Sequence, residues 1–578
     1  MNTTALVAIS LFVLSSSGRA APGDMEAGFD PNVNGTVRGL ALQLDGSLLV
    51  SGDFTTVGGV TRSRICRLIP GGALDAGFNP GADGPVYCIA PQADGRVLAG
   101  GTFSVAGGLA RNNFVRLTTG GAAEAAFNPD MNDLVRCMEF QTDGWLYAGG
   151  DFSTTGGVGT GRFVRLDSGG ARDPGFSPGV EQGVFSAAFQ TDGKLLIGGY
   201  FNTVGGVAHG KIARFLSNGT VDAAFNPSAN DIVRSLLVQP DGRIIIAGNF
   251  SLVNGVSRSS IARLLADGSL DGAFNPVVSG DVYSSALQAD GKILLGGTFT
   301  AAAGISRSRI ARLLPNGSLD TTFAASAGGN VYALLLQPDG KIMAGGQFTT
   351  FNSLTRNRLV RLANDAATQG LTVPTLQRIQ WLRGGASPEV NAVTFDLSTN
   401  GGAAWTPLGS GARIAGGWEL TGLTLPVSGQ VRARARTLSG YGNGSSSLIE
   451  TIAAYSGTPL QVWRQTHFGT PHATGSAADN ADPDKDGLEN LVEFAFGLNP
   501  NVPDAATLPQ WQHDDDDYSL TFTRPANVSG ITYAAEYSSS LAPGSWTPAV
   551  NFSTPPAYMF LAPAVTQRLY LRVRVTAP

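Results

Sequence analysis

The sequence predicts an all-β protein: a seven-bladed β-propeller followed by smaller β-sandwich modules. The phenylalanine of a Phe-Asn-Pro-like tripeptide recurs seven times at a constant step of 49 residues, at positions 29, 78, 127, 176, 225, 274 and 323. An Asp-Gly pair keeps the same step, beginning at positions 45, 94, 143, 192, 241, 290 and 339. A sequence unit of constant length indicates one supersecondary unit repeated in space.

Each repeat is expected to form four antiparallel strands. In the sixth copy, an apolar run at 282–288 meets the turn pair Asp290-Gly291, and a second run follows at 292–300. An Asp-Gly step between two such runs is a strong hairpin signal, because both turn residues tolerate positive φ. Further runs at 308–314 and 319–323 supply the third and fourth strands, and the unit shows no helical periodicity.

A four-stranded unit of this length is typical of a propeller blade, and propellers commonly have four to eight blades. The second strand carries a Gly-Gly pair in most copies, as at Gly100-Gly101. Such a pair weakens an ordinary strand but suits a place where backbones crowd together, as they do near a propeller axis. The competing architecture, an open β-solenoid, needs capping segments, and the sequence shows none. Residues 21–365 are therefore assigned to the propeller.

The chain ends predict how the ring closes. Every repeat has an arginine in its third strand, at positions 67, 116, 165, 214, 263, 312 and 361. An acid precedes each repeated phenylalanine by three residues: Glu26, Asp75, Glu124, Asp173, Asp222, Asp271 and Asp320. We expect these arginines and acids to form ion pairs within the blades. Because Arg361 has no acid after it and Glu26 has no blade before it, residues 24–29 are expected to complete the seventh blade.

A second basic position lies where the loop meets the third strand, at Arg62, Arg111, Arg258, Arg307 and Arg356, with Thr160 and His209 in the other two copies. We expect these side chains to be solvated loop charges. A ring of cations that meets an anionic ligand on one face is the alternative.

The repeat pattern F-[ND]-P…Q-x-D-G-[KR]…GG-x-F…R-L…DG-[ST]-L-D over residues 24–365 resembles the delta-60 repeat family of bacterial propeller-like proteins. The resemblance implies a β-propeller, and it brings neither an agreed activity nor catalytic residues. A fold of this kind does not imply a function.

Composition excludes some partners. The 578 residues suggest three or four domains. A net charge of −5 argues against nucleic acid and anionic membrane surfaces as main partners. The three cysteines, Cys66, Cys88 and Cys137, occupy strand positions and are expected to be small core residues.

The N-terminus predicts export. An apolar run at 5–14 is too short to span a bilayer, and the small residues Gly18 and Ala20 suit a signal-peptidase site. Residues 1–20 are therefore assigned to a signal peptide, although the first residues lack the usual lysine or arginine. We expect a secreted or cell-surface protein, extracellular or periplasmic, without a transmembrane segment.

Two further β modules are expected after the ring. Residues 364–370 have the composition of a linker, and alternating runs such as 392–397 and 430–436 follow between Gly-rich turns. This spacing predicts an immunoglobulin- or fibronectin-III-like β-sandwich over 371–456. Runs at 518–523 and 531–536 predict a second, C-terminal β-sandwich module over 505–578.

The most specific chemical motif lies between these modules, where residues 482–493 fit the calcium-loop pattern D-x-D-x-D-G-x5-E. Calcium takes six to eight oxygen ligands, and Gly487 permits the sharp turn that lets the aspartates converge. The expected ligands are Asp482, Asp484, Asp486, the backbone carbonyl of Leu488, Asn490 and both carboxylate oxygens of Glu493. Apolar residues on either side predict short helices, so residues 457–504 are assigned to a helix–calcium loop–helix segment.

Residues 482–500 resemble the calcium repeats of thrombospondin type-3 and dockerin domains. Those families stack or pair their loops, whereas this chain has one, so the calcium affinity is expected to be weak, on the order of 0.1–1 mM. The cofactor expected is therefore structural calcium, and a merely acidic turn is the alternative.

The leading functional hypothesis is a non-enzymatic, monomeric binding protein whose propeller takes a glycan or protein ligand. Among four histidines only His209 lies in the ring, and the chain has no G-x-S-x-G or H-E-x-x-H motif. No catalytic residue is assigned, and the ligand-binding residues are left open. The alternative, an extracellular carbohydrate-active hydrolase or lyase, needs two facing carboxylates about 5–10 Å apart. The acids that break the repeat symmetry are its candidates: Asp130, Asp133, Glu139 and Glu181.

Overall fold

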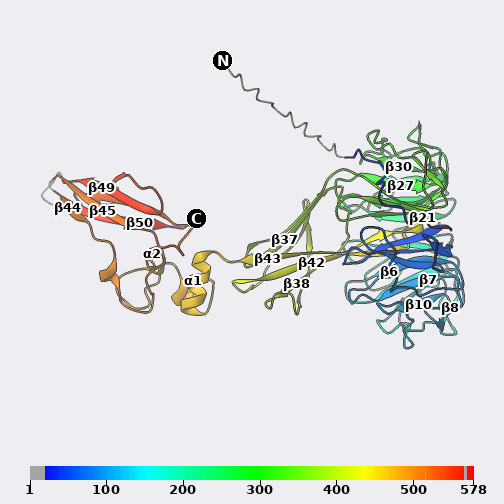
Figure 1. Cartoon of the computed structure of the whole chain (residues 1–578), viewed down its shortest axis with the longest axis horizontal. Helices are drawn as coiled ribbons and strands as arrows, with labels where there is room; N and C mark the ends of the chain where they lie inside the picture. Colours follow the sequence, from blue (N-terminus) through cyan, green and yellow to red (C-terminus); the bar gives the residue numbers. More distant parts are fainter. Residues whose placement is uncertain (1–19, 515, 565–568, 578) are drawn as a thin grey trace, which may run out of the picture.

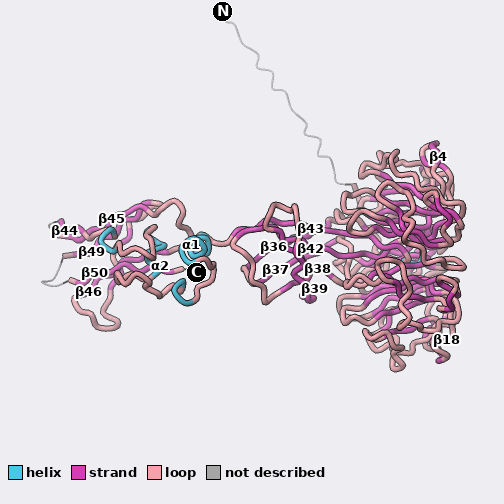
Figure 2. The backbone as a smooth tube through the Cα atoms, turned by 90° about the horizontal axis from the view of Figure 1, so that it is seen from below, coloured by secondary structure: helices cyan, strands magenta, loops and turns pink. Residues whose placement is uncertain are grey.

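The computed structural model describes residues 20–514, 516–564 and 569–577. A ring of β blades is followed by a β-sandwich, a segment with two short helices and a C-terminal β module, and these parts lie in an elongated row (Figures 1 and 2). The predicted fold class is confirmed. The predicted signal peptide lies outside the described residues except for Ala20.

Each blade contains a three-stranded antiparallel sheet in which the middle strand pairs with both neighbours. The innermost strands are β1 (Val37–Leu42), β6 (Val86–Pro91), β11 (Val135–Phe140), β16 (Val184–Phe189), β21 (Val233–Val238), β26 (Val282–Leu287) and β31 (Val331–Leu336). The middle strands are β2 (Leu48–Gly52), β7 (Val97–Gly101), β12 (Leu146–Gly150), β17 (Leu195–Gly199), β22 (Ile244–Gly248), β27 (Ile293–Gly297) and β32 (Ile342–Gly346). The third strands are β5 (Ile65–Leu68), β10 (Phe114–Leu117), β15 (Phe163–Leu166), β20 (Ile212–Phe215), β25 (Ile261–Leu264), β30 (Ile310–Leu313) and β35 (Leu359–Leu362).

A small hairpin joins the middle strand to the third strand in every blade. These hairpins are β3–β4 (Thr56–Val57, Val60–Thr61), β8–β9 (Val105–Ala106, Leu109–Ala110), β13–β14 (Thr154–Thr155, Val158–Gly159), β18–β19 (Thr203–Val204, Val207–Ala208), β23–β24 (Leu252–Val253, Val256–Ser257), β28–β29 (Ala301–Ala302, Ile305–Ser306) and β33–β34 (Thr350–Phe351, Leu354–Thr355). The expected fourth strand is reduced to a single bridge to the third strand, such as that between Leu68 and Leu74.

The ring closes as the chain ends predict. Met25 bridges Leu362, and the amide of Glu26 donates to the carbonyl of Arg361 at 2.9 Å. The Arg361 guanidinium donates to the Glu26 carboxylate at 2.5 Å and lies 4.6 Å from the ring centroid of buried Phe29. The other six arginine–acid pairs form within their own blades, as expected.

The Gly-Gly pairs mark places where adjacent blades meet. A Cβ added at Gly345 would lie 2.5 Å from Cγ1 of Val37, and one at Gly100 would lie 2.7 Å from Cγ1 of Val135. In both cases the valine begins the innermost strand of the next blade. The glycines are therefore needed because the inner strands crowd together toward the axis.

The sandwich after the ring consists of two four-stranded sheets. One has the order β36 (Ala367–Thr375), β37 (Arg378–Gly385), β41 (Gly417–Leu420), β40 (Ala412–Ile414), and the other β39 (Thr406–Ser410), β38 (Val393–Ser398), β42 (Ser428–Ser439), β43 (Ser445–Ser456). Trp381, Phe395 and Trp418 form the centre of its core.

The hairpin of β42 and β43 is longer than the sandwich, and its tip enters the central channel of the ring (Figure 1). We call residues 439–447, which include the 3-10 turn η1 (Tyr441–Asn443), the channel hairpin. Amides of the innermost strands donate to its oxygens: Leu42 to Ser447 Oγ at 2.9 Å, Ile89 to Ser445 Oγ at 3.1 Å and Met138 to the Gly444 carbonyl at 3.1 Å. Two of its glycines, Gly442 and Gly444, leave no room for a side chain. A Cβ added at either position would lie 3.0 Å or less from a carbonyl oxygen of an innermost strand.

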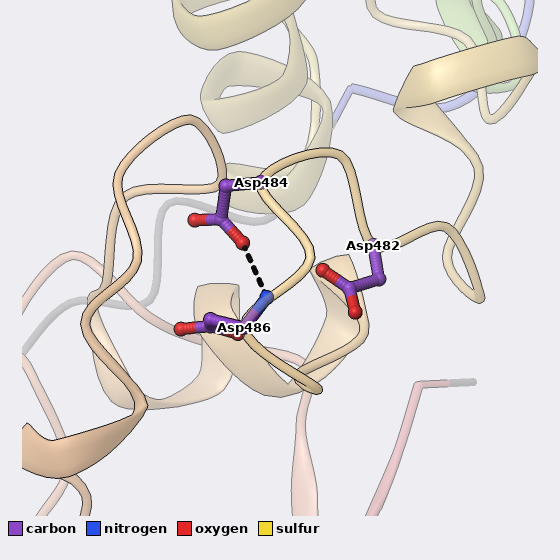
Figure 3. A group of neighbouring side chains, drawn as sticks. All are labelled: Asp482, Asp484 and Asp486. Atoms are coloured by element: carbon purple, nitrogen blue, oxygen red, sulfur yellow. Dashed lines mark hydrogen bonds between the residues drawn. The ribbon is translucent and has the colours of Figure 1, made fainter.

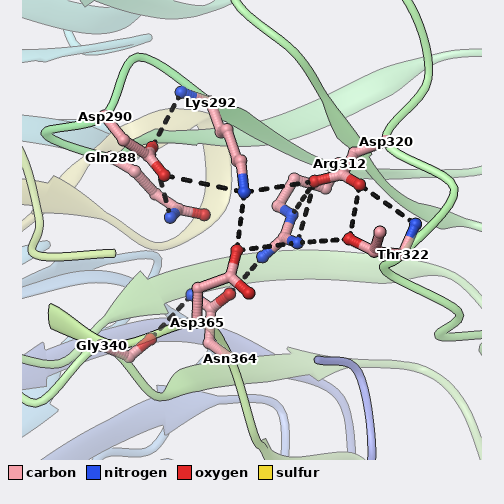
Figure 4. Close-up of polar contacts among 9 residues, drawn as sticks. All are labelled: Gln288, Asp290, Lys292, Arg312, Asp320, Thr322, Gly340, Asn364 and Asp365. Carbon is pink, nitrogen blue, oxygen red and sulfur yellow. Dashed lines mark hydrogen bonds and ion pairs between the residues drawn. The ribbon is translucent and has the colours of Figure 1, made fainter. Parts of the chain in front are cut away.

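Residues 364 and 365, expected to belong to a linker, are instead held by blades six and seven (Figure 4). Lys292 Nζ lies 2.6 Å from Asp365 Oδ2, and the fully buried Arg312 guanidinium contacts both Asp320 and Asp365. Asn364 donates to the Gly340 carbonyl at 2.8 Å. The chain therefore leaves the ring through an ion-paired contact, which fixes where the sandwich begins.

The remaining elements form one packed unit. Helix α1 (Pro459–Phe468) has a capping box at Thr458 and ends at Gly469, and the turns η2 (Gly475–Ala477) and η3 (Ala505–Thr507) flank helix α2 (Asn490–Phe496). The C-terminal sheets have the orders β44 (Gln512–Asp514), β45 (Asp517–Thr523), β49 (Ala557–Pro563), β48 (Val550–Asn551) and β47 (Thr547–Pro548), β46 (Thr532–Ser538), β50 (Tyr570–Thr576). Trp463 of α1 and Phe494 of α2 share their core. Within the described residues, no helix is long and apolar enough to cross a membrane.

We predict that closing the ring contributes as much stability as an internal blade contact. Phe29→Ala should destabilise the propeller by about 3–5 kcal/mol, since Phe29 is 2% exposed and its removal leaves a cavity. Phe225→Ala, at the equivalent place in the fourth blade, is the matched control. Urea unfolding followed by near-ultraviolet circular dichroism measures both, and a cost below about 1 kcal/mol for Phe29 alone would contradict closure by this segment.

We also predict that the channel tolerates no larger residue at Gly444. A Cβ there would lie 2.3 Å from the carbonyl oxygen of Arg136, while the φ of Gly444 is −79°, so the penalty is steric. Gly444→Ala should therefore cost about 1–3 kcal/mol. Gly370→Ala, where a Cβ meets nothing within 4 Å, should leave the melting temperature nearly unchanged. Equal melting temperatures for the two variants would show that the hairpin does not fill the channel.

Candidate functional site

Three aspartates converge on the loop before α2 (Figure 3). One carboxylate oxygen from each of Asp482, Asp484 and Asp486 lies within 4.8 Å of the others. The two oxygens of Asp482 accept the amides of Lys485 and Gly487 at 2.8 and 3.0 Å, which folds the loop back on itself. Gly487 has φ of 93°, as the sharp turn requires.

Helix α2 brings two further predicted ligands to this loop. Glu493 is fully buried, and neither of its carboxylate oxygens has a hydrogen-bond partner among the described residues. Asn490 donates to the carbonyls of Ser476 and Ala478 at 2.7 Å, while its Oδ1 is buried and without a partner there. Burial, followed by the charges of the neighbouring aspartates, raises the pKa of Glu493 to about 7. A buried carboxylate of this kind calls for a compensating positive charge.

Asp504 joins the cluster from the far side, and sequence reasoning missed it. Its Oδ1 is buried and has no partner in the described chain, and its charge is one of those that raise the pKa of Glu493. The amides of Asp504 and Ala505 donate to Asp486 Oδ2 at 2.9 and 2.8 Å. One oxygen of Asp486 therefore holds the turn at residues 504 and 505 against the loop, and Asp504 becomes a further candidate ligand.

The donor set consists of oxygen atoms, which suits a hard cation that takes several carboxylates. Asp484 Oδ2, Glu493, Asn490 Oδ1 and Asp504 Oδ1 are all buried without partners in the described part of the chain. Leu488 lies in the loop and donates its amide to Asp486 Oδ1 at 2.9 Å, while the role of its carbonyl stays a prediction. The sequence and the structure together point to the same candidate metal centre.

We predict that calcium stabilises the C-terminal segment. If the dissociation constant is about 0.1–1 mM, 10 mM Ca²⁺ should add about 1.4–2.7 kcal/mol to the free energy of unfolding. Thermal melts of the whole chain with calcium and with chelator measure this. Glu493→Gln and Asp504→Asn should reduce the calcium-dependent shift, whereas Glu489→Gln, on the exposed N-cap of α2, should keep it. A shift that is absent in the unmodified protein, or unchanged in Glu493→Gln, would overturn the assignment.

A second feature lies at the end of the channel that is remote from the sandwich. All seven innermost strands shift register at their second residue, as at a β-bulge. A bulge redirects a side chain. The seven residues at this position, which we call the mouth ring, are Arg38, Tyr87, Arg136, Phe185, Arg234, Tyr283 and Tyr332.

Tyr441, at the tip of the channel hairpin, occupies the centre of the mouth ring. Its aromatic ring stacks on Tyr283 with centroids 5.6 Å apart, and it meets Tyr87 and Tyr332 edge to face at 6.1 and 5.8 Å. Its hydroxyl accepts a hydrogen bond from Arg234 at 2.9 Å. The result is a partly exposed aromatic surface built from two domains.

The arginines of the mouth ring are held by acids or amides of the middle strands. Arg38 pairs with Asp53 at 2.8 Å, and Arg136 pairs with Asp151 at 2.5 Å. Arg234 donates to Asn249 at 2.6 Å. Their guanidinium planes are thereby fixed beside the aromatic rings, as with Arg38, which lies 4.6 Å from the Tyr87 centroid. Sequence reasoning missed this ring, because its residue type changes from copy to copy.

Three of the four acids that break the repeat symmetry accept hydrogen bonds from their own part of the ring. Asp130 accepts from Asn112 at 2.7 Å, Asp133 accepts the Leu134 amide, and Glu181 accepts the amides of Asn202 and Thr203. Asp133 lies just before the start of β11, and Glu139 lies close to the end of this strand. Their six-residue separation along an extended chain corresponds to about 20 Å. Asp133 and Glu139 therefore do not form the pair of facing carboxylates expected for a glycosidase.

The expectation for the second basic position was wrong for four of its five arginines, while Arg307 is half-buried. Arg62, Arg111, Arg258 and Arg356 are buried rather than solvated, each no more than 8% exposed. Arg111, for example, donates to the carbonyls of Ala110, Glu124 and Ala125. These arginines fix the loop of their own blade.

Comparison with known proteins agrees with the ring architecture. A family model described as "Domain of unknown function (DUF5122) beta-propeller" matches seven segments: residues 43–78, 92–127, 141–176, 190–225, 239–274, 288–323 and 337–365. No curated protein matches the chain.

Solved structures show distant similarity. The extracellular domain of a one-component system from B. thetaiotaomicron has 11% identity and a TM-score of 0.37, and the match covers 63% of this chain and 45% of that one. The Neurospora crassa Pan2 WD40 domain has 15% identity and a TM-score of 0.26, covering 46% and 76%. The GH74 xyloglucanase from Xanthomonas campestris has 10% identity and a TM-score of 0.19, covering 70% and 76%. At these scores the likenesses carry no argument about function.

Proposed function

Because the ring consists of DUF5122 β-propeller repeats, a family with no assigned function, we propose a function from the geometry of the protein itself. The chain is a non-enzymatic secreted or cell-surface protein, and its propeller binds a glycan at the mouth ring. The aromatic surface around Tyr441 is the observation that carries this proposal.

The chemistry of the mouth ring suits a sugar. The C–H face of a pyranose packs on aromatic rings, and sugar hydroxyls accept from arginines and donate to carboxylates. Tyr87, Tyr283 and Tyr332 offer such rings, and the Arg38–Asp53 pair offers donors and acceptors beside them. Because each arginine is already paired or hydrogen-bonded, the surface favours a neutral polar ligand over a strongly anionic one.

The remaining parts fit an extracellular setting. The apolar run at 5–14 supports export, and a single calcium loop of weak affinity suits the millimolar calcium found outside cells. In this proposal the C-terminal modules act as a spacer or attachment unit stiffened by calcium. The resemblance to the delta-60 repeat family and to thrombospondin type-3 loops is consistent with it.

We predict that the unmodified protein binds at least one polysaccharide on a glycan array. The double variant Tyr87→Ala/Tyr332→Ala should lose at least ten-fold in affinity by calorimetry, since each ring supplies stacking area. Phe552→Ala, which removes an aromatic side chain 58% exposed on the C-terminal module, is the control and should bind normally.

Binding that survives in the double variant, or an array without any hit, would overturn the proposal. Release of shortened sugars from a bound polysaccharide would instead favour the hydrolase or lyase alternative. If the mouth ring bound a protein and no glycan, the ligand would be a protein and the glycan proposal would be wrong.

A further inference from the structure

A cavity of about 660 Å³ lies between the ring and the sandwich, on the side away from the mouth ring. Its propeller wall includes Glu139, Phe140 and Phe189, and its sandwich wall includes Trp418 and Arg436. Cavities of this size at domain boundaries, mostly apolar with a few polar groups, are typical of small-molecule sites.

Glu139 is not needed to build its blade. The equivalent residues of the other six repeats are Ala41, Ala90, Ala188, Leu237, Ala286 and Leu335. Glu139 is buried, with 8% of the residue exposed, and its Oε2 has no hydrogen-bond partner among the described residues. Glu139 is an acid at an apolar repeat position, and among the described residues only the charge of Arg436 offsets its burial, so its role lies outside the blade.

Arg436 enters the same cavity from β42. Its guanidinium lies 3.7 Å from the ring centroid of Phe140, and it donates to Ser446 Oγ at a long 3.4 Å. The side chain is surrounded by protein yet keeps some accessible surface where it lines the cavity. Trp418 also lines the cavity, while its Nε1 is buried within the protein and has no partner among the described residues.

The other charged groups that line the cavity are already satisfied. They are Arg116 with Glu124 at 2.6 Å, Arg434 with Glu450 at 2.5 Å, Glu389 with Arg413 at 2.6 Å, Asp94 with Arg96 at 2.5 Å, and Asp167 with the amides of Gly169 and Ala171. Burial raises the pKa of Glu139 to about 8 and lowers the pKa of Arg436 to about 10. The raised pKa of Glu139 favours its neutral form, so the positive charge of Arg436 is only partly balanced within the cavity.

We propose that this cavity binds a small organic carboxylate with an apolar body. Its carboxylate lies against Arg436 and accepts hydrogen bonds from the guanidinium and from the carboxyl group of Glu139. Its apolar part packs against Phe140 and Phe189. The site is distinct from the mouth ring and does not depend on glycan binding.

Calorimetry of the full chain with two matched pairs of probes tests the charge requirement. Indole-3-acetate should bind at least ten-fold more tightly than indole-3-ethanol, and octanoate more tightly than octan-1-ol, because each neutral partner lacks the carboxylate that Arg436 binds. Equal binding of acid and alcohol, or no binding of any of the four, would overturn the proposal. This comparison needs no variant, so it holds even if a substitution unfolds the protein.

Variants then locate the binding. Arg436→Met should lower the affinity for indole-3-acetate at least ten-fold, because it removes the cation and its donors. Arg243→Gln, a surface arginine on a blade turn, is the matched control and should bind normally. Unchanged binding in a folded Arg436→Met protein would place the probe elsewhere and overturn the proposal.

The pH dependence gives a readout that a purely structural role of Glu139 would not move. Above pH 8 Glu139 ionises and repels the ligand carboxylate, so the dissociation constant of indole-3-acetate should rise between pH 7 and pH 9. In Glu139→Gln the side chain stays a neutral donor, so the affinity should stay nearly constant over this range. The same rise in both proteins would show that Glu139 does not face the ligand and would overturn its assigned role.

Discussion

The channel hairpin is the contact on which the rest of the architecture depends. A propeller ring leaves polar backbone groups of its innermost strands facing an axis, and buried amides need partners. Here Leu42, Ile89 and Met138 find those partners on a hairpin that belongs to the next domain. The hairpin therefore joins the ring to the sandwich and completes the interior of the ring, while the sandwich has a core of its own.

Both candidate ligand sites of the ring follow from this hairpin. At its tip, Tyr441 fills the centre of the mouth ring and turns seven separate side chains into one surface. Arg436, which precedes the channel hairpin in β42, enters the cavity between the domains and interacts with Glu139. The repeat is close to symmetric, whereas binding sites need asymmetry. In this protein the asymmetry comes from an element inserted from outside the repeat.

The sequence was sufficient for those features that leave a periodic or local pattern. The blade count, ring closure through Glu26 and Arg361, and the oxygen ligands on one loop all follow from spacing along the chain. The hairpin was not predicted, because 439–447 has the composition of a flexible turn and its partners lie in distant strands. Asp504 was missed for the same reason, since it reaches the loop across space. The second basic position was misjudged because charge alone does not show that carbonyl groups surround an arginine.

Ring closure also has a consequence for the order in which the protein assembles. Residues 25 and 26 pair with residues 361 and 362 of the seventh blade. The N-terminal segment therefore lacks this strand partner until the last repeat has been made. The hairpin that occupies the axis comes later still in the chain. Contacts so far apart in sequence form slowly, and open strand edges invite wrong pairing while they wait. The finished ring is thus a late product of synthesis, and its inner strands stay without their final partners until residues 439–447 arrive.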